Sequence, residues 1–309
     1  MQLSNNLSHF RRPKNKSGLD EALAIVQNSG MQFGDFEIQF LTDGAFKLDG
    51  GAMFGIVPKP LWTRERPCDE RNRMTLACNC PLIRAGKEVI LIDCGLGRKW
   101  NGKQRDIYDI DARPRLIEEL AAQGLAPKDV TILIHSHLHL DHAGWNTQFN
   151  AKGELEPVFV NARHIVERRE LEVARKPNEI QRGTYLQNNV APIEADSGFE
   201  TFDETREVVP GITLMRTGGH TAGHIAVRIE SGGQHALFIG EMMPTTAHRH
   251  LPWIMAYDLF PLETLEMKRT LFAECVANNS LVLLNHDPTA FAVRMHNPSG
   301  DKLEIEKVC

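Results

Sequence analysis

Four side chains of metal-binding type lie within six positions of the sequence: His137, His139, Asp141 and His142. They follow the apolar run 130–134, which predicts a short buried strand. In an extended backbone successive side chains alternate in direction, so positions 137, 139 and 141 share one side and position 142 faces the other. Burying three imidazoles and a carboxylate together is costly unless they bind a cation. The spacing therefore predicts a site for a divalent ion such as zinc, iron or manganese.

The pattern His137-x-His139-x-Asp141-His142 resembles the H-x-H-x-D-H signature of the metallo-β-lactamase superfamily of metal hydrolases. The alternative, a polar loop that is merely rich in histidine, is disfavoured because distant parts of the chain match the family's other ligand positions. The resemblance extends from about position 36 to position 286. It implies an α/β fold of the four-layer αββα type, in which two sheets pack face to face with helices outside.

Two of the distant matches are histidines. His220 lies in the stretch 217–224 (TGGHTAGH) and matches the third metal-binding imidazole of the family's G-H-T-x-G-H motif. His224 in the same stretch matches a position that is typically structural. His286 follows the apolar run 281–284 and matches the family's last ligand.

The third distant match departs from the family pattern. Glu241 follows Gly240 at the end of a predicted strand, where the family has an Asp that bridges two metals. Because Glu is one methylene longer, three outcomes stay open: Glu241 bridges both ions, binds one, or leaves the second site weakened. We expect it to be a ligand. Asp258 is a further carboxylate of interest.

Carried over position by position, the resemblance implies two divalent ions, zinc in the first place and iron or manganese as alternatives. One ion would be held by His137, His139 and His220, the second by Asp141, His142 and His286, with Glu241 between them. Two such ions would supply a water of lowered pKa as the nucleophile for hydrolysis. Asp141 would be the catalytic residue that orients the nucleophile or passes a proton to the leaving group.

Hydrophobic alternation, helical periodicity and turn residues predict the elements that must position these side chains. Strands are expected at 36–41, 74–83, 88–92, 130–134, 157–160, 207–209, 212–216, 224–229, 236–239 and 281–284, and helices at 19–27, 113–123, 162–176 and 262–278. Asp43-Gly44 predicts a turn, and 177–197 is interpreted as a long insertion that could cover a pocket. Residues 291–295 and 302–308 predict a terminal hairpin.

Several residues are expected around the ligands. In the family an Asp at the position of Asp93 supports the metal-binding loops from behind. The glycine-rich segment 50–62 is either an apolar loop near the pocket or a loop packed on the core. The same two interpretations apply to the second group of pocket candidates. The candidates are Met53, Phe54 and Trp62 in the first group and His248, His250, Trp253 and Tyr257 in the second.

With 309 residues, of which 42% are hydrophobic, the chain can bury a large core. We expect one domain over 1–309, with an N-terminal extension and helix at 1–35, a catalytic core at 36–286 and a C-terminal hairpin at 287–309. A formal net charge of −5 argues against a nucleic-acid partner. No apolar stretch approaches membrane-spanning length.

Six cysteines are too few for a disulfide framework at this length, and Cys78 and Cys80 are expected to be buried free thiols. A cytoplasmic protein is therefore expected. The number of subunits stays open, with a homodimer as one option.

The segment with Met53, Phe54 and Trp62 and the preceding helix resemble the lactonase and organophosphate-hydrolase branch of the family. The tyrosine of acyl-homoserine lactonases three residues after the bridging Asp is absent, because Pro244 stands there; Tyr257 is a possible substitute. We predict a hydrolase of small-molecule lactones or esters. The alternatives are a phosphotriesterase or phosphodiesterase, and a degenerate member that binds metal without catalysis.

Overall fold

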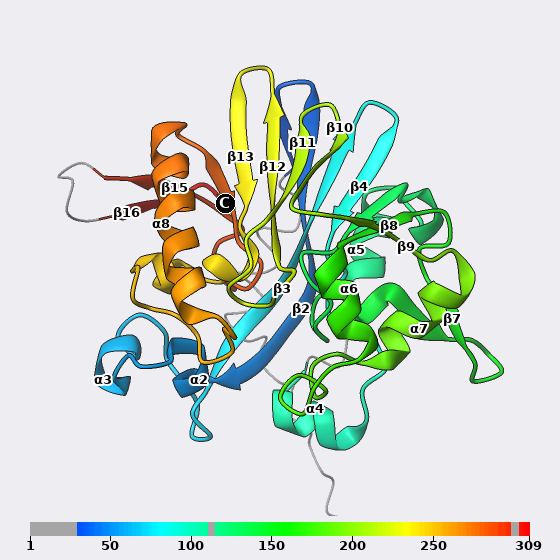
Figure 1. Ribbon diagram of the computed structural model, residues 1–309, viewed down its shortest axis with the longest axis horizontal. Coiled ribbons are helices and arrows are strands. Elements are labelled where there is room, and N and C mark those ends of the chain that lie inside the picture. Colours follow the sequence, from blue (N-terminus) through cyan, green and yellow to red (C-terminus); the bar gives the residue numbers. More distant parts are fainter. Residues whose placement is uncertain (1–29, 111–114, 298–302) are drawn as a thin grey trace, which may run out of the picture.

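The computed structural model describes residues 30–110, 115–297 and 303–309. In these ranges the chain forms two seven-stranded sheets with helices on their outer sides (Figure 1). The architecture is the αββα sandwich of mixed α/β class that the resemblance implied. The helix expected at 19–27 lies outside the described residues.

The first sheet places the ends of its parallel strands at one edge. Its order is β1-β2-β3-β4-β5-β8-β9, antiparallel from β1 to β4 and parallel from β4 onward. The strands are β1 (Gly30–Phe33), β2 (Phe36–Asp49), β3 (Arg73–Ala85), β4 (Glu88–Ile92), β5 (Ile132–Ile134), β8 (Arg163–Glu167) and β9 (Phe199–Phe202). Because parallel strands end at the same edge, the segments after β4 and β5 lie close together.

The second sheet repeats this arrangement with one parallel pair, β13 and β14. Its order is β10-β11-β12-β13-β14-β15-β16. The strands are β10 (Thr205–Val209), β11 (Ile212–Arg216), β12 (Ile225–Ser231), β13 (Gln234–Phe238), β14 (Leu281–Leu283), β15 (Ala292–His296) and β16 (Glu304–Lys307). A separate small hairpin pairs β6 (Thr147–Phe149) with β7 (Leu155–Pro157).

Helices cover both outer faces of the sandwich. In Figure 1, α8 lies on one side, and α5, α6 and α7 lie on the other. The α-helices are α2 (Gly50–Phe54), α3 (Lys59–Trp62), α4 (Gly102–Tyr108), α5 (Leu116–Ala122), α6 (Arg168–Arg175), α7 (Gln187–Asp196) and α8 (Pro261–Ala277). Short 3-10 helices are η1 (Pro127–Asp129), η2 (Gly144–Asn146), η3 (Gly240–Met242) and η4 (Thr246–Arg249).

The main core lies between the two sheets. Ile83, Ile134, Val227, Phe238 and Leu283 belong to one buried cluster with residues from both sheets. Each fully buried side chain of this size contributes about 1.5–3 kcal/mol. Separate clusters form where α5 and α8 pack on the outer faces. The strand ends that carry the candidate ligands are therefore anchored from both sides.

The helix expected over 162–176 is wrong in its first part. Residues Arg163–Glu167 form β8, and only Arg168–Arg175 form a helix. Ile165 and Val166 are fully buried, and β8 pairs in parallel with β5. The charged residues on either side gave this stretch a helical pattern, but pairing in the sheet decided its structure. The adjoining strand β9 was not predicted either.

The turn expected at Asp43-Gly44 is a bulge inside a longer strand. β2 continues to Asp49 with a register shift between Thr42 and Ala45. Asp43 is buried, and its carboxylate accepts hydrogen bonds from Trp145 Nε1 and from three backbone N–H groups. Burial raises the pKa of Asp43 to about 6 although these donors oppose the rise. Asp43 therefore does not form a turn; its carboxylate connects three segments through hydrogen bonds to residues 96–97, 116 and 145.

Smaller differences concern loops. Segment 50–62 contains α2 and α3 in place of a continuous loop, and insertion 177–197 contains α7. The strand expected at 157–160 is wrong, because only Pro157 of these residues is in a strand, as the last residue of β7. All six cysteines are free, and Cys78 and Cys80 are buried as expected.

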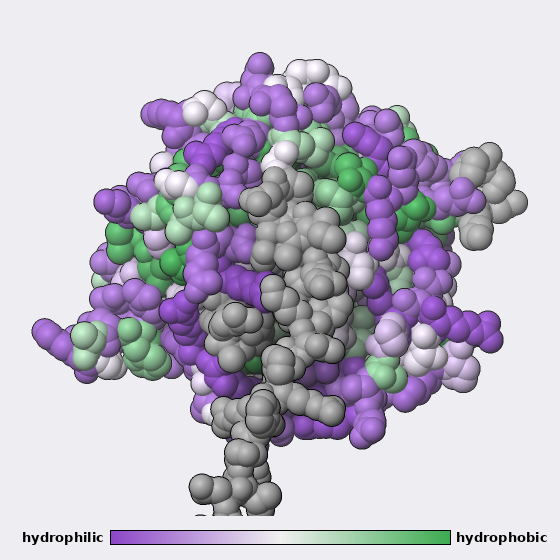
Figure 2. Space-filling model, turned by 180° about the vertical axis from the view of Figure 1, so that it is seen from behind, coloured by the Kyte–Doolittle hydropathy of each residue, from purple (hydrophilic) through white to green (hydrophobic). Residues whose placement is uncertain are grey.

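The surface is mixed in character. On the face seen in Figure 2, hydrophilic residues are interspersed with smaller hydrophobic areas. None of the helices in the described part of the chain is long and apolar enough to cross a membrane.

Candidate metal centre

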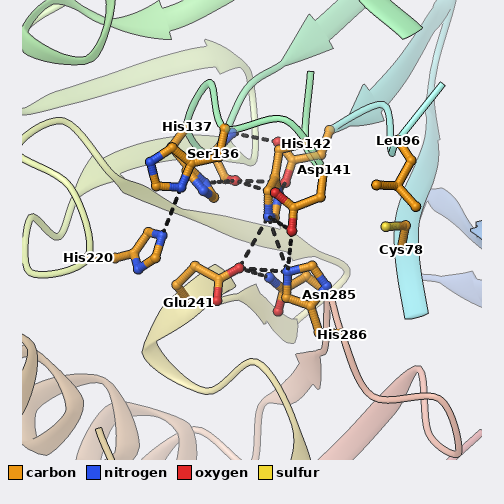
Figure 3. A network of polar contacts seen from close by, with 12 residues as sticks. Cys78, Leu96, Ser136, His137, Asp141, His142, His220, Glu241, Asn285 and His286 are labelled. Carbon is orange, nitrogen blue, oxygen red and sulfur yellow. Dashed lines mark hydrogen bonds and ion pairs between the residues drawn. The ribbon is translucent and has the colours of Figure 1, made fainter. Parts of the chain in front are cut away.

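Every candidate ligand lies just past the end of a strand. His137, His139, Asp141 and His142 follow β5 of the first sheet. The other three come from the second sheet: His220 follows β11, Glu241 follows β13 and His286 follows β14. The structure brings all seven side chains together at one edge of the sandwich, as Figure 3 shows for six of them.

The first donor group consists of His137, His139 and His220, whose donor atoms all lie within 4.8 Å of one another. His220 Nε2 is 3.2 Å from His139 Nδ1. His137 Nε2 is buried and has no hydrogen-bond partner among the described residues. Burial lowers the pKa of His137 and of His139 well below the usual range, so both rings are neutral near pH 7. Neutral imidazole is the form that binds a metal ion.

The second donor group consists of Asp141, His142 and His286, again within 4.8 Å of one another. The Nε2 atoms of His142 and His286 are 3.2 Å apart. The Asp141 carboxylate lies 3.6 Å from His286 Nε2 and 3.8 Å from His142 Nε2. Figure 3 shows these side chains pointing toward one another.

Glu241 contacts the second group and also belongs to a donor group with His137 and His142. Its Oε1 atom is 3.2 Å from His142 Nε2 and 2.9 Å from His286 Nε2. The side-chain amide of Asn285 donates a hydrogen bond to the same oxygen. The longer side chain therefore reaches the ligands from β13, and Asn285 holds it there.

These residues fit divalent metal ions. Two ligands bound 2.0–2.1 Å from a tetrahedral ion are about 3.3 Å apart. The donor–donor distances quoted above range from 2.9 to 3.8 Å, and the donors are the imidazoles and carboxylates that zinc, iron and manganese accept. The buried Nε2 of His137 also requires a partner, and the described residues do not supply one.

The second nitrogen of four of the rings contacts a partner outside the donor groups, and for His137 this partner is the hydroxyl of Ser136, 3.0 Å from Nδ1. Asp93 lies 2.8 Å from His142 Nδ1, and Asp258 lies 2.8 Å from His220 Nδ1. His286 Nδ1 donates to the carbonyl of Ala77 at 2.7 Å. Such contacts fix ring orientation and leave the other nitrogen for the metal.

Asp93 also accepts hydrogen bonds from the backbone N–H and the hydroxyl of Ser136, both at 2.7 Å. This carboxylate therefore joins the segment after β4 to the loop after β5, which is the supporting position expected for it. His224 is outside the donor groups: its Nε2 accepts from the N–H of Glu241 at 3.1 Å, and Thr217 contacts its Nδ1. Burial lowers the pKa of His224 to about 3.

A pocket of about 210 Å³ opens over the donor groups. Its walls are largely apolar, with two phenol rings. Apart from the seven candidate ligands, it is lined by Phe46, Leu48, Met53, Tyr108, Leu140, Ile180, Gln181, Thr184, Met255, Ala256, Tyr257 and Leu259. Met53 and Tyr257 thus line the pocket, which is one of the two interpretations that the sequence left open, and residues of insertion 177–197 form part of the wall.

Five other pocket candidates do not line this pocket: Phe54, Trp62, His248, His250 and Trp253. Phe54 stacks on Trp62, at 5.2 Å between ring centroids, and on His248, at 4.8 Å. Both nitrogens of the His248 ring are bound, to Thr245 and to the carbonyl of Met53. These rings form a buried layer, because aromatic packing and satisfied hydrogen bonds hold them away from the pocket. His250 and Trp253 border a different hollow, beside α8.

Several site residues were not predicted. Tyr108 comes from α4, and nothing in its sequence context indicates a pocket. Asn285 precedes a ligand directly, which is the one signal that could have identified it. Glu170 contacts two ligand-bearing loops from α6, but its charged neighbours made it look exposed.

The model of the metallo-beta-lactamase superfamily matches residues 73–273. An N-acyl homoserine lactonase of Bacillus sp is 30% identical over 162 residues, which are 49% of this chain and 58% of that protein. The chain thus matches little more than half the length of this relative. The N-acyl homoserine lactonase AttM of Rhizobium radiobacter is 30% identical over 198 residues, 60% of this chain and 70% of that protein.

Solved structures with the same fold are also similar to this chain. A probable metal-dependent hydrolase from Staphylococcus aureus has a TM-score of 0.82 and 33% identity, and covers 90% of this chain and 100% of that one. The dizinc quorum-quenching lactonase AidC has a TM-score of 0.74 over 91% of this chain and 97% of that one; at 16% identity it shows the fold alone. The matched model, which spans more than half of the chain, shows that this protein belongs to the metallo-β-lactamase superfamily.

Proposed function

We propose that the protein is a dinuclear-metal-dependent hydrolase that opens small-molecule lactones, with N-acyl homoserine lactones as the first substrate class to test. The observation that carries this proposal is the pair of adjacent donor groups at the bottom of one pocket. The N-acyl homoserine lactonases among its relatives support the choice of substrate.

The candidate ligands fall into two sets, one for each ion. We assign His137, His139 and His220 to one ion, Asp141, His142 and His286 to the other, and Glu241 to the position between them. When bound, such a pair of ions supplies a water of lowered pKa and polarises the carbonyl oxygen of the substrate.

Asp141 is the best candidate for moving a proton. Its side chain is 13% exposed, whereas that of Glu241 is 4% exposed, so Asp141 is the more accessible of the two carboxylates. It also borders the pocket. A carboxylate in this place can hold the proton of the attacking water and pass it to the leaving oxygen when the ring opens.

The pocket walls suit a substrate with an apolar chain and few polar groups. Phe46, Leu48, Ile180 and Met255 present apolar surface. Tyr257 borders the same space, and burial raises its pKa to about 12, so that its hydroxyl keeps its proton at neutral pH. A protonated phenol can donate a hydrogen bond to a substrate carbonyl. We assign this part to Tyr257, in place of the tyrosine that Pro244 replaces.

Zinc is the metal we propose. We propose the reducing cytoplasm as the compartment, because all six thiols are free. The alternatives remain a phosphotriesterase or phosphodiesterase and a member that binds metal without catalysis. The apolar walls and the lactonase relatives favour the lactonase.

The test is a hydrolysis assay on protein whose metal content has been measured. N-acyl homoserine lactones with short and long chains, simple lactones, aryl esters and bis-aryl phosphates would be compared by their kcat/KM values. We expect a lactone to be the best substrate. His220→Ala should lower its kcat/KM by roughly 1,000-fold. His235→Ala, at an exposed histidine outside the site, is the matched control and should change nothing.

Two ions per chain without any lactone hydrolysis would contradict the proposal. A clear preference for the phosphate esters would support the second candidate. Fewer than one ion per chain, with no hydrolysis of any compound, would identify a degenerate member.

A further inference from the structure

Glu170, in the first turn of α6, has a fully buried carboxylate whose three described hydrogen-bond partners are all uncharged donors. It accepts from the backbone N–H of Leu138 at 2.9 Å, from the hydroxyl of Tyr185 at 2.8 Å and from the hydroxyl of Thr221 at 2.6 Å. Burying a carboxylate is costly even when it is hydrogen-bonded. We therefore expect the Glu170 carboxylate to make contacts that an apolar side chain could not make.

The three donors belong to segments that meet at the first donor group. Leu138 stands between His137 and His139, and Thr221 directly follows His220. One carboxylate therefore connects the two loops that carry all three imidazoles of this group.

The third donor connects the pocket wall to the same place. Tyr185 directly follows the wall residues Ile180, Gln181 and Thr184, and its ring packs edge-on against His139 at 4.7 Å between centroids. Its hydroxyl donates a hydrogen bond to Glu170 Oε1, the oxygen that also accepts from the backbone N–H of Leu138.

The His220 loop also packs directly on α6. A Cβ atom added to Gly223 would lie 2.3 Å from the backbone nitrogen of Glu170, so only glycine allows this approach. The second donor group has other supports: His142 is held by Asp93, and His286 by the carbonyl of Ala77. Contacts from Glu170 are therefore specific to the first group.

We propose that Glu170 is a positioning residue that fixes the two loops of the first metal site and the pocket-wall segment 180–184 relative to one another. The proposal rests on the proposed function only in that the first donor group binds a metal ion. Glu170 does not touch the substrate or the ions; it acts through Leu138, Thr221 and Tyr185.

The main test measures metal binding by the full-length chain carrying Glu170→Ala or Glu170→Gln. Zinc content and chelator competition report on affinity, and the visible spectrum of the cobalt(II) form reports on geometry. In Glu170→Ala we expect one of the two ions to bind about 10–100-fold more weakly, with an altered cobalt spectrum.

Glu170→Gln should restore binding to within about 3-fold, because its amide oxygen can accept from Leu138 and Tyr185 while its NH₂ group donates to the Thr221 hydroxyl. Glu119→Ala is the matched control, since Glu119 is also a buried glutamate but lies on α5. It should leave both the zinc affinity and the cobalt spectrum unchanged.

Tyr185→Phe separates the wall from the metal site. It removes the contact with Glu170 but keeps a ring against His139, so zinc affinity should stay unchanged while KM rises about 3–10-fold at constant kcat. If Glu170→Ala does not fold, Thr221→Val removes a single contact and should weaken one ion about 3–10-fold.

Two results would overturn the proposal: wild-type affinity for both ions in Glu170→Ala and Thr221→Val, or equal impairment of the Gln and Ala variants, which would assign the effect to charge. Because the main readout is metal binding, a wild-type protein that binds two ions but hydrolyses no lactone would contradict the proposed function and leave this test valid.

Discussion

Glu241 reaches His142 and His286 with a side chain one methylene longer than the aspartate of the family pattern. The extra length gives its carboxylate an additional rotatable bond, and the amide of Asn285 restricts that freedom by donating to Oε1. Asn285 itself is buried, and its backbone carbonyl accepts from the N–H of Asn79 at 2.8 Å. The replacement at position 241 is thus accompanied by a specific contact that places the carboxylate.

Replacing Asn285 with alanine should release Glu241 from this position. We expect one of the two ions to bind about 10–100-fold more weakly, because the Glu241 side chain would then have to become ordered when the ion binds, which lowers the affinity for the ion. Zinc titration against a chelator would measure the change. Asn161→Ala, at an exposed asparagine, serves as the control. Unchanged zinc affinity in Asn285→Ala would show that Glu241 is held by other contacts.

At this scale the sequence predicted the ligands better than their neighbours. His137, His139, Asp141 and His142 lie within six positions just past β5, so their types and spacing alone indicate a metal site. The alternation expected of an extended backbone is wrong, because a turn at 140–142 places Asp141 with His142 and not with His137 and His139. His220, Glu241 and His286 were identified only through the family resemblance, because nothing local links residues that far apart. For His248 the sequence left a pocket position and a packed loop open, and the structure shows the packed loop, with both ring nitrogens hydrogen-bonded.

The elements that hold the site make close backbone contacts. Gly144, two residues after His142, donates its N–H to the carbonyl of Gly95 at 2.7 Å. A Cβ atom at Gly144 would lie 2.1 Å from the backbone of Leu96, so the loops after β4 and β5 are in direct contact. A side chain at this position must push the two loops apart.

Gly144→Ala should therefore lower the free energy of unfolding by about 2 kcal/mol, as overpacking does elsewhere. Denaturant unfolding at neutral pH measures this change. Gly102→Ala is the matched control, because the space around Gly102 is open and it begins a helix. Equal stability of the two variants would mean that the loop after β5 can move without cost.

Local patterns predicted the strands well where alternation or an apolar run was clear, as in β3, β5 and β14. They failed at β8, since its only apolar residues, Ile165 and Val166, lie between polar and charged residues that fit a helix equally well. Sheet pairing with β5 is a long-range interaction and leaves no mark in the local sequence. For the same reason Glu170 was not recognised as buried.

Considered as a whole, the molecule has its ligands divided between two sheets. Four come from the first sheet and three from the second, so bound ions would join the layers at one edge. Two carboxylates and five imidazoles lie close together there. The pocket was harder to predict than the metal centre, because its walls come from α4, the segment after α6 and the loop before α8.

Metal removal should destabilise the whole fold. Ions that bind the folded chain and not the unfolded one contribute a stability set by their concentration relative to Kd. We expect a chelator to lower Tm by about 10 °C and added zinc to restore it. Differential scanning calorimetry with and without chelator makes the comparison. An identical Tm in both conditions would show that the donor groups are stable without ions.

The floor and the walls of the pocket belong to different parts of the chain. Strand-end loops hold the floor, whereas Tyr108 and Ile180 come from segments outside both sheets. Exchanging α4 or segment 180–184 for those of a relative would therefore alter which substrates are accepted while the candidate metal ligands stay in place. The substrate range can therefore change through substitutions in one wall segment at a time, without changes in the loops that carry the candidate metal ligands.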